Sequence, residues 1–240
     1  MNPSPDSSHG RRAFFRTAVL AAGAATLNPT RASADAPAKG AVESAAPVGY
    51  LCFGPDEAAF VEALVEIMCP ADELTPGGVE CGLAHFMDRQ LAGPFGKGDR
   101  LYRRGPWRPG RPEDGYQLPL TPEQFFKAGI KAANQACLAA HRRQFPELTA
   151  EEADRILQLI STGDLKSPAF AFSEWFNDLV YPLFTQACFA DPIYGGNRGK
   201  VFWTLVGYPG LPAVNGLNMI KYRGKPYPGA RLPKSIEDFS

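Results

Sequence analysis

The chain has 240 residues, of which 45% are hydrophobic, and it carries 25 basic and 25 acidic side chains. This balance argues against a nucleic-acid-binding protein, which would need a concentrated basic face. After Leu27 no apolar run reaches the ~20 residues that a membrane-spanning helix requires, so we expect contact with a membrane only through other proteins.

The first 34 residues have the pattern of a twin-arginine export signal. Arg11 and Arg12 precede Phe14, Phe15 and a mildly apolar run over residues 17–27, which has the length of a signal-peptide core. Ala32-Ser33-Ala34 supplies a cleavage site after Ala34. This pathway exports proteins that are already folded and that usually hold a cofactor, so we expect the chain in the periplasm, with the twin-arginine translocase as one partner.

Removal of residues 1–34 takes away four arginines and one aspartate. The remaining 206 residues carry 21 basic and 24 acidic side chains, a net charge of about −3. Residues 35–49 are rich in Ala, Pro and Gly and are typical of a flexible leader. Residues 50–240 are long enough for one domain with a sizeable core.

The spacing of apolar residues predicts a mainly α fold. We expect helices over about residues 55–69, 79–91, 121–145, 149–160, 168–184 and 201–206. Pro182 lies inside the fifth of these and should kink or break it, because proline lacks the backbone donor and its ring clashes with the preceding turn. The sequence thus predicts an irregular domain of about five to six helices.

Two segments do not fit the helical pattern. Residues 93–119 combine many Gly and Pro residues with arginines and with Tyr102 and Trp107. A loop of this length without structure is uncommon in a compact domain, and its aromatic residues favour packing against this domain or against another protein. The last thirty residues are interpreted as an extended tail of coil that needs a surface to lie on.

No catalytic, cofactor-binding or metal-binding residue is predicted in this chain. His85 is expected to face solvent and His141 to be a hydrogen-bonded core residue, and there is no Glu-x-x-His pair for a di-iron bundle. Gly96-Lys97-Gly98 lacks the third glycine and the preceding strand of a dinucleotide site. Cys137 lies on an apolar helix face and is expected to be buried and inert.

Five cysteines remain after the signal: Cys52, Cys69, Cys81, Cys137 and Cys188. An oxidising compartment permits disulfides, and an odd number leaves at least one thiol unpaired or paired with another chain. A Cys69–Cys81 bond would close a short turn between two helices and stabilise the fold by roughly 2–3 kcal/mol. The competing interpretation is a free or intermolecular thiol, for which Cys52 or Cys188 could serve.

The segment Asp191-Pro192-Ile193-Tyr194-Gly195-Gly196-Asn197-Arg198 is the most specific in the chain. Asp-Pro starts a turn, and the two glycines permit a sharp bend. The residues alone leave two readings open: a tight loop that joins two helices, and a rigid loop that is presented to a partner. The candidate interface residues are Tyr102, Trp107, Asp191, Pro192, Tyr194, Gly195, Gly196 and Asn197.

Residues 191–197, followed by Lys200-Val201-Phe202-Trp203 and Gly207-Tyr208-Pro209-Gly210, resemble the hallmark of the gluconate 2-dehydrogenase subunit 3 family. Three further segments agree with the family in order. They are Pro70-Ala71-Asp72 with Thr75-Pro76-Gly77, Tyr102-Arg103-Arg104-Gly105-Pro106, and Gly115-Tyr116-Gln117 leading into Leu120-Thr121-Pro122. Cys69 and Cys81 depart from the apolar or small residues of relatives, which favours their pairing here.

The resemblance implies a non-catalytic small subunit of a three-part periplasmic dehydrogenase. A large subunit of the glucose-methanol-choline type would carry FAD, and a multihaem cytochrome c subunit would pass electrons to the membrane quinone pool. The small subunit would supply the export signal and support maturation of the large subunit, and the complex would hold it at the inner membrane. The substrate would be gluconate, another sugar acid, a sugar or a polyol. The rival hypothesis is a stand-alone exported helical protein that binds a metal or a small molecule.

Overall fold

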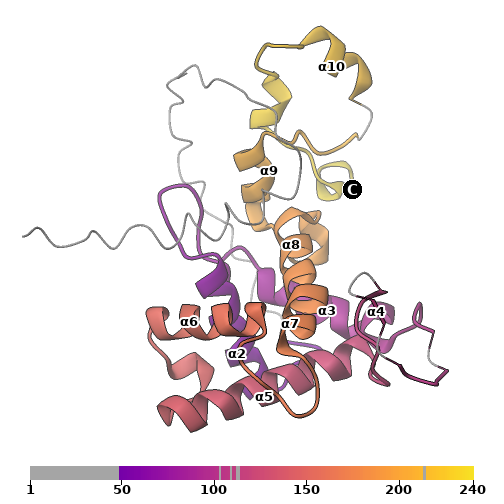
Figure 1. Ribbon diagram of the computed structural model, residues 1–240. Coiled ribbons are helices and arrows are strands. Elements are labelled where there is room, and N and C mark those ends of the chain that lie inside the picture. Colours follow the sequence, from indigo (N-terminus) through magenta and orange to yellow (C-terminus); the bar gives the residue numbers. More distant parts are fainter. Residues whose placement is uncertain (1–48, 103, 109, 112–113, 213–214) are drawn as a thin grey trace, which may run out of the picture. The chain divides into compact units, whose positions relative to one another are not determined.

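The computed structural model describes residues 49–240 except 103, 109, 112–113 and 213–214 (Figure 1). The predicted export signal, with Arg11, Arg12, Phe14, Phe15 and the cleavage site after Ala34, lies outside the described residues. The same is true of the predicted leader apart from Gly49.

The described part of the chain is mainly α-helical and contains no strand, which confirms the predicted fold class. Its α-helices are α2 (Pro55–Met68), α3 (Leu83–Ala92), α4 (Pro94–Lys97), α5 (Pro122–His141), α6 (Ala150–Thr162), α7 (Phe172–Glu174), α8 (Tyr181–Phe189), α9 (Val201–Val206) and α10 (Gly216–Lys221). A π-helix, η4 (Trp175–Val180), joins α7 to α8. The 3-10 turns are η3 (Phe145–Glu147), η5 (Pro192–Tyr194), η6 (Arg198–Lys200), η7 (Pro228–Arg231) and η8 (Ile236–Phe239).

Two helices begin at capping boxes that the sequence predicts. The Thr121 hydroxyl accepts the Gln124 N–H at 3.3 Å, and the Gln124 side chain accepts the Thr121 N–H at 3.0 Å. Thr149 and Glu152 make the same pair of bonds at the start of α6. These bonds satisfy backbone donors that the first turn of a helix otherwise leaves free.

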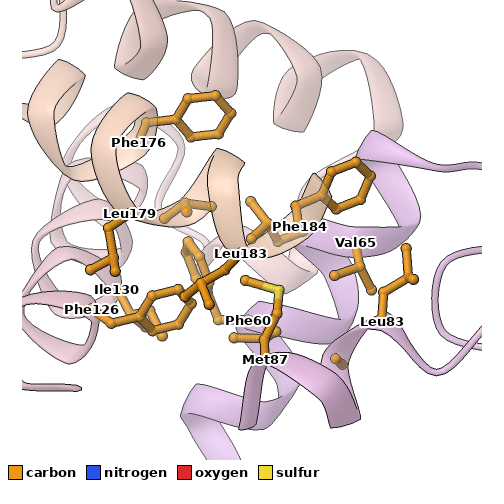
Figure 2. Close-up of a cluster of buried hydrophobic side chains, with 14 of the residues drawn as sticks. Phe60, Val65, Leu83, Met87, Phe126, Ile130, Phe176, Leu179, Leu183 and Phe184 are labelled. Carbon is orange, nitrogen blue, oxygen red and sulfur yellow. The ribbon is translucent and has the colours of Figure 1, made fainter. Parts of the chain in front are cut away.

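The core lies where α2, α3, α5, η4 and α8 meet, and each contributes buried apolar side chains (Figure 2). The labelled members are Phe60 and Val65 from α2, Leu83 and Met87 from α3, Phe126 and Ile130 from α5, Phe176 and Leu179 from η4, and Leu183 and Phe184 from α8. Burial of each such side chain contributes about 1.5–3 kcal/mol relative to exposure. The apolar stripes of the sequence therefore converge on one cluster.

Trp175 fixes the contact between α5 and η4. Its side chain is fully buried, and the indole Nε1–H donates to the Phe126 carbonyl at 3.2 Å. The ring lies against Gly129, where an added Cβ would be far closer to the indole atoms than van der Waals contact allows. The glycine is therefore required by the close approach of the two helices.

Pro182 does not break its helix, although regular α-helical hydrogen bonding is interrupted just before it. Helical backbone continues from α7 through η4 into α8, and Pro182 lies in the first turn of α8. The Tyr181 N–H bonds to the Phe176 carbonyl, five residues earlier. This wider turn accommodates a ring that would clash with the carbonyl of a regular α-helix.

Several predicted helix boundaries also shift, and the fifth predicted helix runs from Phe172 to Phe189 rather than over residues 168–184. Helix α3 begins at Leu83, because residues 79–82 form a turn that ends at Gly82 in the left-handed conformation. Helix α5 ends at His141, where Arg142 adopts φ 56°.

Asp88 on α3 holds the residues that precede α2. The Asp88 carboxylate is buried and accepts the backbone N–H groups of Leu51, Cys52 and Phe53 at 2.7, 2.8 and 2.9 Å. Three charge-assisted bonds to one carboxylate are stronger than bonds between neutral groups. They tie the start of the domain to α3.

The C-terminal tail lies on residues 191–211 of the same chain. Lys234 exchanges backbone hydrogen bonds with Pro209 and Leu211, at 3.0 and 2.8 Å. The Ile236 N–H donates to the Asp191 carboxylate at 2.9 Å, and Lys200 pairs with Asp238. The prediction that the tail needs a surface is confirmed, but its description as coil is wrong where α10, η7 and η8 form.

Candidate functional site

Residues 191–197, the segment with the most specific sequence pattern, form a loop that is held at both ends. Asp191 accepts the Ile193 N–H at 3.2 Å and so caps η5. Asn197 is fully buried. Its Nδ2 donates to the Ala190 carbonyl at 3.1 Å, and its Oδ1 accepts the Phe202 N–H at 3.0 Å. Asn197 therefore joins the end of α8 to the start of α9.

The loop also packs closely against the turn before α3. The Arg198 N–H donates to the Cys81 carbonyl at 3.0 Å. Gly195 has φ 100°, a conformation that favours glycine, and a Cβ on Gly196 would lie 2.5 Å from the Ala187 carbonyl oxygen. Both glycines are thus explained by the geometry of the loop itself.

The predicted interface residues divide into two groups. Gly195, Gly196 and Asn197 are buried within this chain, and Asp191 and Pro192 are half-buried. Tyr194 is 52% exposed, and its neighbour Ile193 is exposed as well. The buried residues set the shape of the loop, and the exposed pair forms its outer surface.

A hollow of about 470 Å³ lies beside this exposed pair. It is lined by Phe86, Gln90, Gln186, Phe189, Ala190, Asp191 and Tyr194. The Phe189 side chain lines this hollow and is exposed. Its backbone is held in place, because the Trp203 indole N–H donates to the Phe189 carbonyl at 2.8 Å. We name the exposed residues Phe189, Ile193 and Tyr194 the loop surface.

The other predicted interface residues lie in the long loop before α5. Tyr102 is strongly exposed and Trp107 is exposed to a lesser degree. Tyr116, near the end of this loop, is half-buried with its ring 4.5 Å from that of Phe125. Only part of the loop therefore packs on the domain.

The disulfide expected between Cys69 and Cys81 is not present, because all five cysteines are free thiols. The Cys69 and Cys81 sulfurs lie 4.0 and 3.6 Å from the same Pro76 carbonyl oxygen, so both thiols are directed at this acceptor. Burial raises the pKa of Cys81 to about 12 and that of Cys137 to about 11. Cys137 is buried as predicted, and Cys188 is also buried.

The two histidines differ from their predicted settings. His85 is half-buried rather than solvent-facing, because its ring stacks on Tyr50 with centroids 4.8 Å apart. Burial lowers the pKa of His85, and the charges of Arg198 and Arg89 act in the same direction. His141 is also half-buried, with Nδ1 3.6 Å from the Glu152 carboxylate. Within the described residues, no three His, Cys, Asp or Glu side chains form a group that could hold a metal.

A second set of exposed apolar residues lies in α9, in α10 and in the tail. It comprises Leu205, Val206, Tyr208, Leu217, Met219, Ile220, Leu232 and Phe239. No helix among the described residues has the length and apolar character needed to cross a membrane. Sequence reasoning missed this set because α9 and α10 have six residues each, too few to show a helical period.

The described part of the chain is an all-α fold with sets of exposed apolar side chains on its surface. The sequence model of gluconate 2-dehydrogenase subunit 3 matches residues 55–210, and the chain belongs to this family. It is accordingly a dehydrogenase accessory subunit that forms a complex with a larger dehydrogenase subunit. No curated protein and no solved structure matches the chain.

Proposed function

We propose that this chain is the non-catalytic small subunit that binds, escorts and stabilises the FAD-bearing large subunit of a periplasmic dehydrogenase. The observation that carries the proposal is a folded-export motif, Arg11-Arg12, on a chain of a dehydrogenase subunit family that has no cofactor motif of its own. The flavin would reside in the large subunit and haem c in a cytochrome subunit. The large subunit would determine whether a sugar acid, a sugar or a polyol is oxidised.

The loop surface is the part of this chain that we assign to the large subunit. Phe189, Ile193 and Tyr194 are exposed apolar or aromatic residues on a backbone that is already fixed. A surface ordered before binding loses less conformational entropy on association than a flexible one. Aromatic residues are also enriched at the centres of protein interfaces.

The first test isolates the tagged chain from the periplasm of its native host and records the absorption spectrum and subunit masses of the material. A large chain with bound flavin is expected in the preparation, with or without haem bands. A colourless, well-folded single chain would contradict the proposal and favour the stand-alone binder.

The second test separates the export function from partner binding. Replacing Arg11 and Arg12 together by lysine is expected to leave both this chain and the dehydrogenase activity of its partner in the cytoplasm. The matched control is Arg31→Lys, which changes an arginine of the same leader outside the pair. Immunoblots and activity assays of separated cell fractions give the result. Normal periplasmic activity in the double variant would refute the escort role.

The loop surface has its own prediction. Tyr194→Ala is expected to weaken recovery of the large subunit by about tenfold, which is the effect of losing one well-packed interface aromatic. Leu138→Ala, an exposed position on α5, is the control. Both variants should retain the wild-type melting temperature, since both side chains are exposed. If Tyr102→Ala weakens recovery and Tyr194→Ala does not, the interface lies instead on the long loop.

A further inference from the structure

Helix α10 presents three strongly exposed apolar side chains, among them Leu217, the most exposed large apolar residue of the described part of the chain. Leu217, Met219 and Ile220 are exposed by 85, 73 and 77%. The helix has only six residues, so its own backbone bonds cannot be the reason that it forms. Figure 1 shows it at the outer end of the C-terminal region, above α9.

The segment around α10 is exclusively basic in its charged residues. Residues 215–234 contain five basic side chains and no acidic one, although the exported chain as a whole carries a net charge of about −3. All five are exposed: Lys221, Arg223, Lys225, Arg231 and Lys234. The acidic residues Glu237 and Asp238 follow this segment, and Asp238 is paired with Lys200. Helix α9, which contacts η7, has no charged residue. We name residues 215–234 the basic arm.

Contacts within the basic arm hold its polar and aromatic groups in place. The Tyr222 and Tyr227 rings have centroids 5.1 Å apart, and the Tyr227 hydroxyl accepts a hydrogen bond from Asn218 at 3.1 Å. The Lys225 N–H donates to the Tyr222 carbonyl at 2.8 Å. The exposed apolar residues of α10 and the arm's cations are thus carried by one locally ordered unit.

We propose that the basic arm is a peripheral membrane contact that binds anionic lipid. Leu217 and Ile220, three residues apart on one face of α10, would enter the headgroup region, and the lysines and arginines would bind lipid phosphates. Exposed apolar residues flanked by cations, with tyrosines beside them, have the composition of elements that lie in a membrane interface.

Two observations favour lipid over a protein surface as the occupant. Lysine is depleted in protein interfaces, whereas three of the arm's five cations are lysines. The arm also lies outside residues 55–210, the part that matches the family, so a role in binding the large subunit does not require it. This contact belongs to the chain itself and adds to any attachment through a cytochrome subunit.

The test measures flotation of the exported chain with vesicles. One set contains phosphatidylglycerol and phosphatidylcholine in equal amounts, and the other contains phosphatidylcholine alone. The wild-type chain is expected to float with the anionic vesicles only. A variant with Leu217→Gln, Met219→Gln and Ile220→Gln, and a second with Lys221→Gln and Lys225→Gln, should each bind them at least about tenfold more weakly. Leu138→Gln, on α5, should bind like the wild type.

The same preparations distinguish this contact from protein docking. Wild-type protein that does not float, or variants that float equally well, would refute the lipid contact. If the apolar variant instead loses the large subunit in a pull-down, α10 binds that partner, and if it changes the oligomeric state, α10 binds a second copy. Loss of flotation by both variants, with recovery of the large subunit unchanged from the wild type, is the expected result. The flotation result by itself does not depend on the escort proposal. Unchanged circular dichroism spectra will establish that the variants are folded.

Discussion

Gly129→Ala is expected to reduce the free energy of unfolding by about 3 kcal/mol or more. The added methyl group would overlap the indole of Trp175, which is fully buried and anchored to the Phe126 carbonyl. Overpacking of a core typically costs 1–3 kcal/mol, and a rigid ring held by a hydrogen bond places this site at the upper end. For a chain of this size the loss corresponds to a fall in melting temperature of about 10 °C.

Thermal and urea unfolding of the purified complex and of the isolated chain measure this effect. Gly216→Ala is the matched control, because Gly216 is also helical but has open space where its Cβ would lie. That variant should be neutral or more stable by up to about 1 kcal/mol, since alanine is the better helix former. Equal melting temperatures for both variants would mean that α5 and η4 do not pack as described.

Asn197→Asp is expected to destabilise the protein by about 3 kcal/mol at neutral pH, although the two side chains have nearly the same shape. The amide donor that faces the Ala190 carbonyl would be replaced by an oxygen, and a buried carboxylate would face that carbonyl oxygen. The backbone is not the cause, because Asp tolerates the left-handed φ of 46° as Asn does.

The loss caused by Asn197→Asp should shrink in acid. Burial raises the pKa of the introduced carboxyl above its unfolded value, so the penalty is complete above the folded pKa and disappears below the unfolded one. A protonated carboxyl can again donate to the Ala190 carbonyl. Melting temperatures of the variant and wild type should therefore converge as pH falls towards 4.

The control for this pair of measurements is Asn177→Asp. Asn177 also donates its amide to a backbone carbonyl, that of Ser161 at 3.1 Å, but it is exposed. Water can replace that bond, so the loss should stay below about 1 kcal/mol. A similar loss at both positions would show that burial at Asn197 is not decisive.

Much of this fold follows from local sequence rules. The capping residues Thr121 and Thr149 fix where α5 and α6 begin, and Gly207 ends α9 as predicted. The failures concern long-range packing. The π-turn before Pro182 and the stacking of His85 on Tyr50 depend on neighbours that no local pattern specifies. The Cys69–Cys81 prediction considered the length of the turn but not the direction of the two thiols.

The candidate surface could be found only in part. The pattern of residues 191–197 identified a loop that exposes Tyr194. It could not show that Gly196 and Asn197 face inward, because their partners Ala187 and Phe202 belong to the flanking helices. Nothing in the sequence marks Phe189 as a surface residue, because an aromatic residue near the end of an apolar helix is usually part of the core.

The anchoring of the tail has a consequence for the order of folding. Asp191 and Lys200 are held by partners 45 and 38 residues further along the chain. During synthesis the loop therefore lacks these restraints until residues 236–238 have emerged. A chain interrupted before that point would leave the loop surface with an unfinished support. An export machinery that rejects incompletely folded substrates would therefore encounter a less ordered backbone around η5.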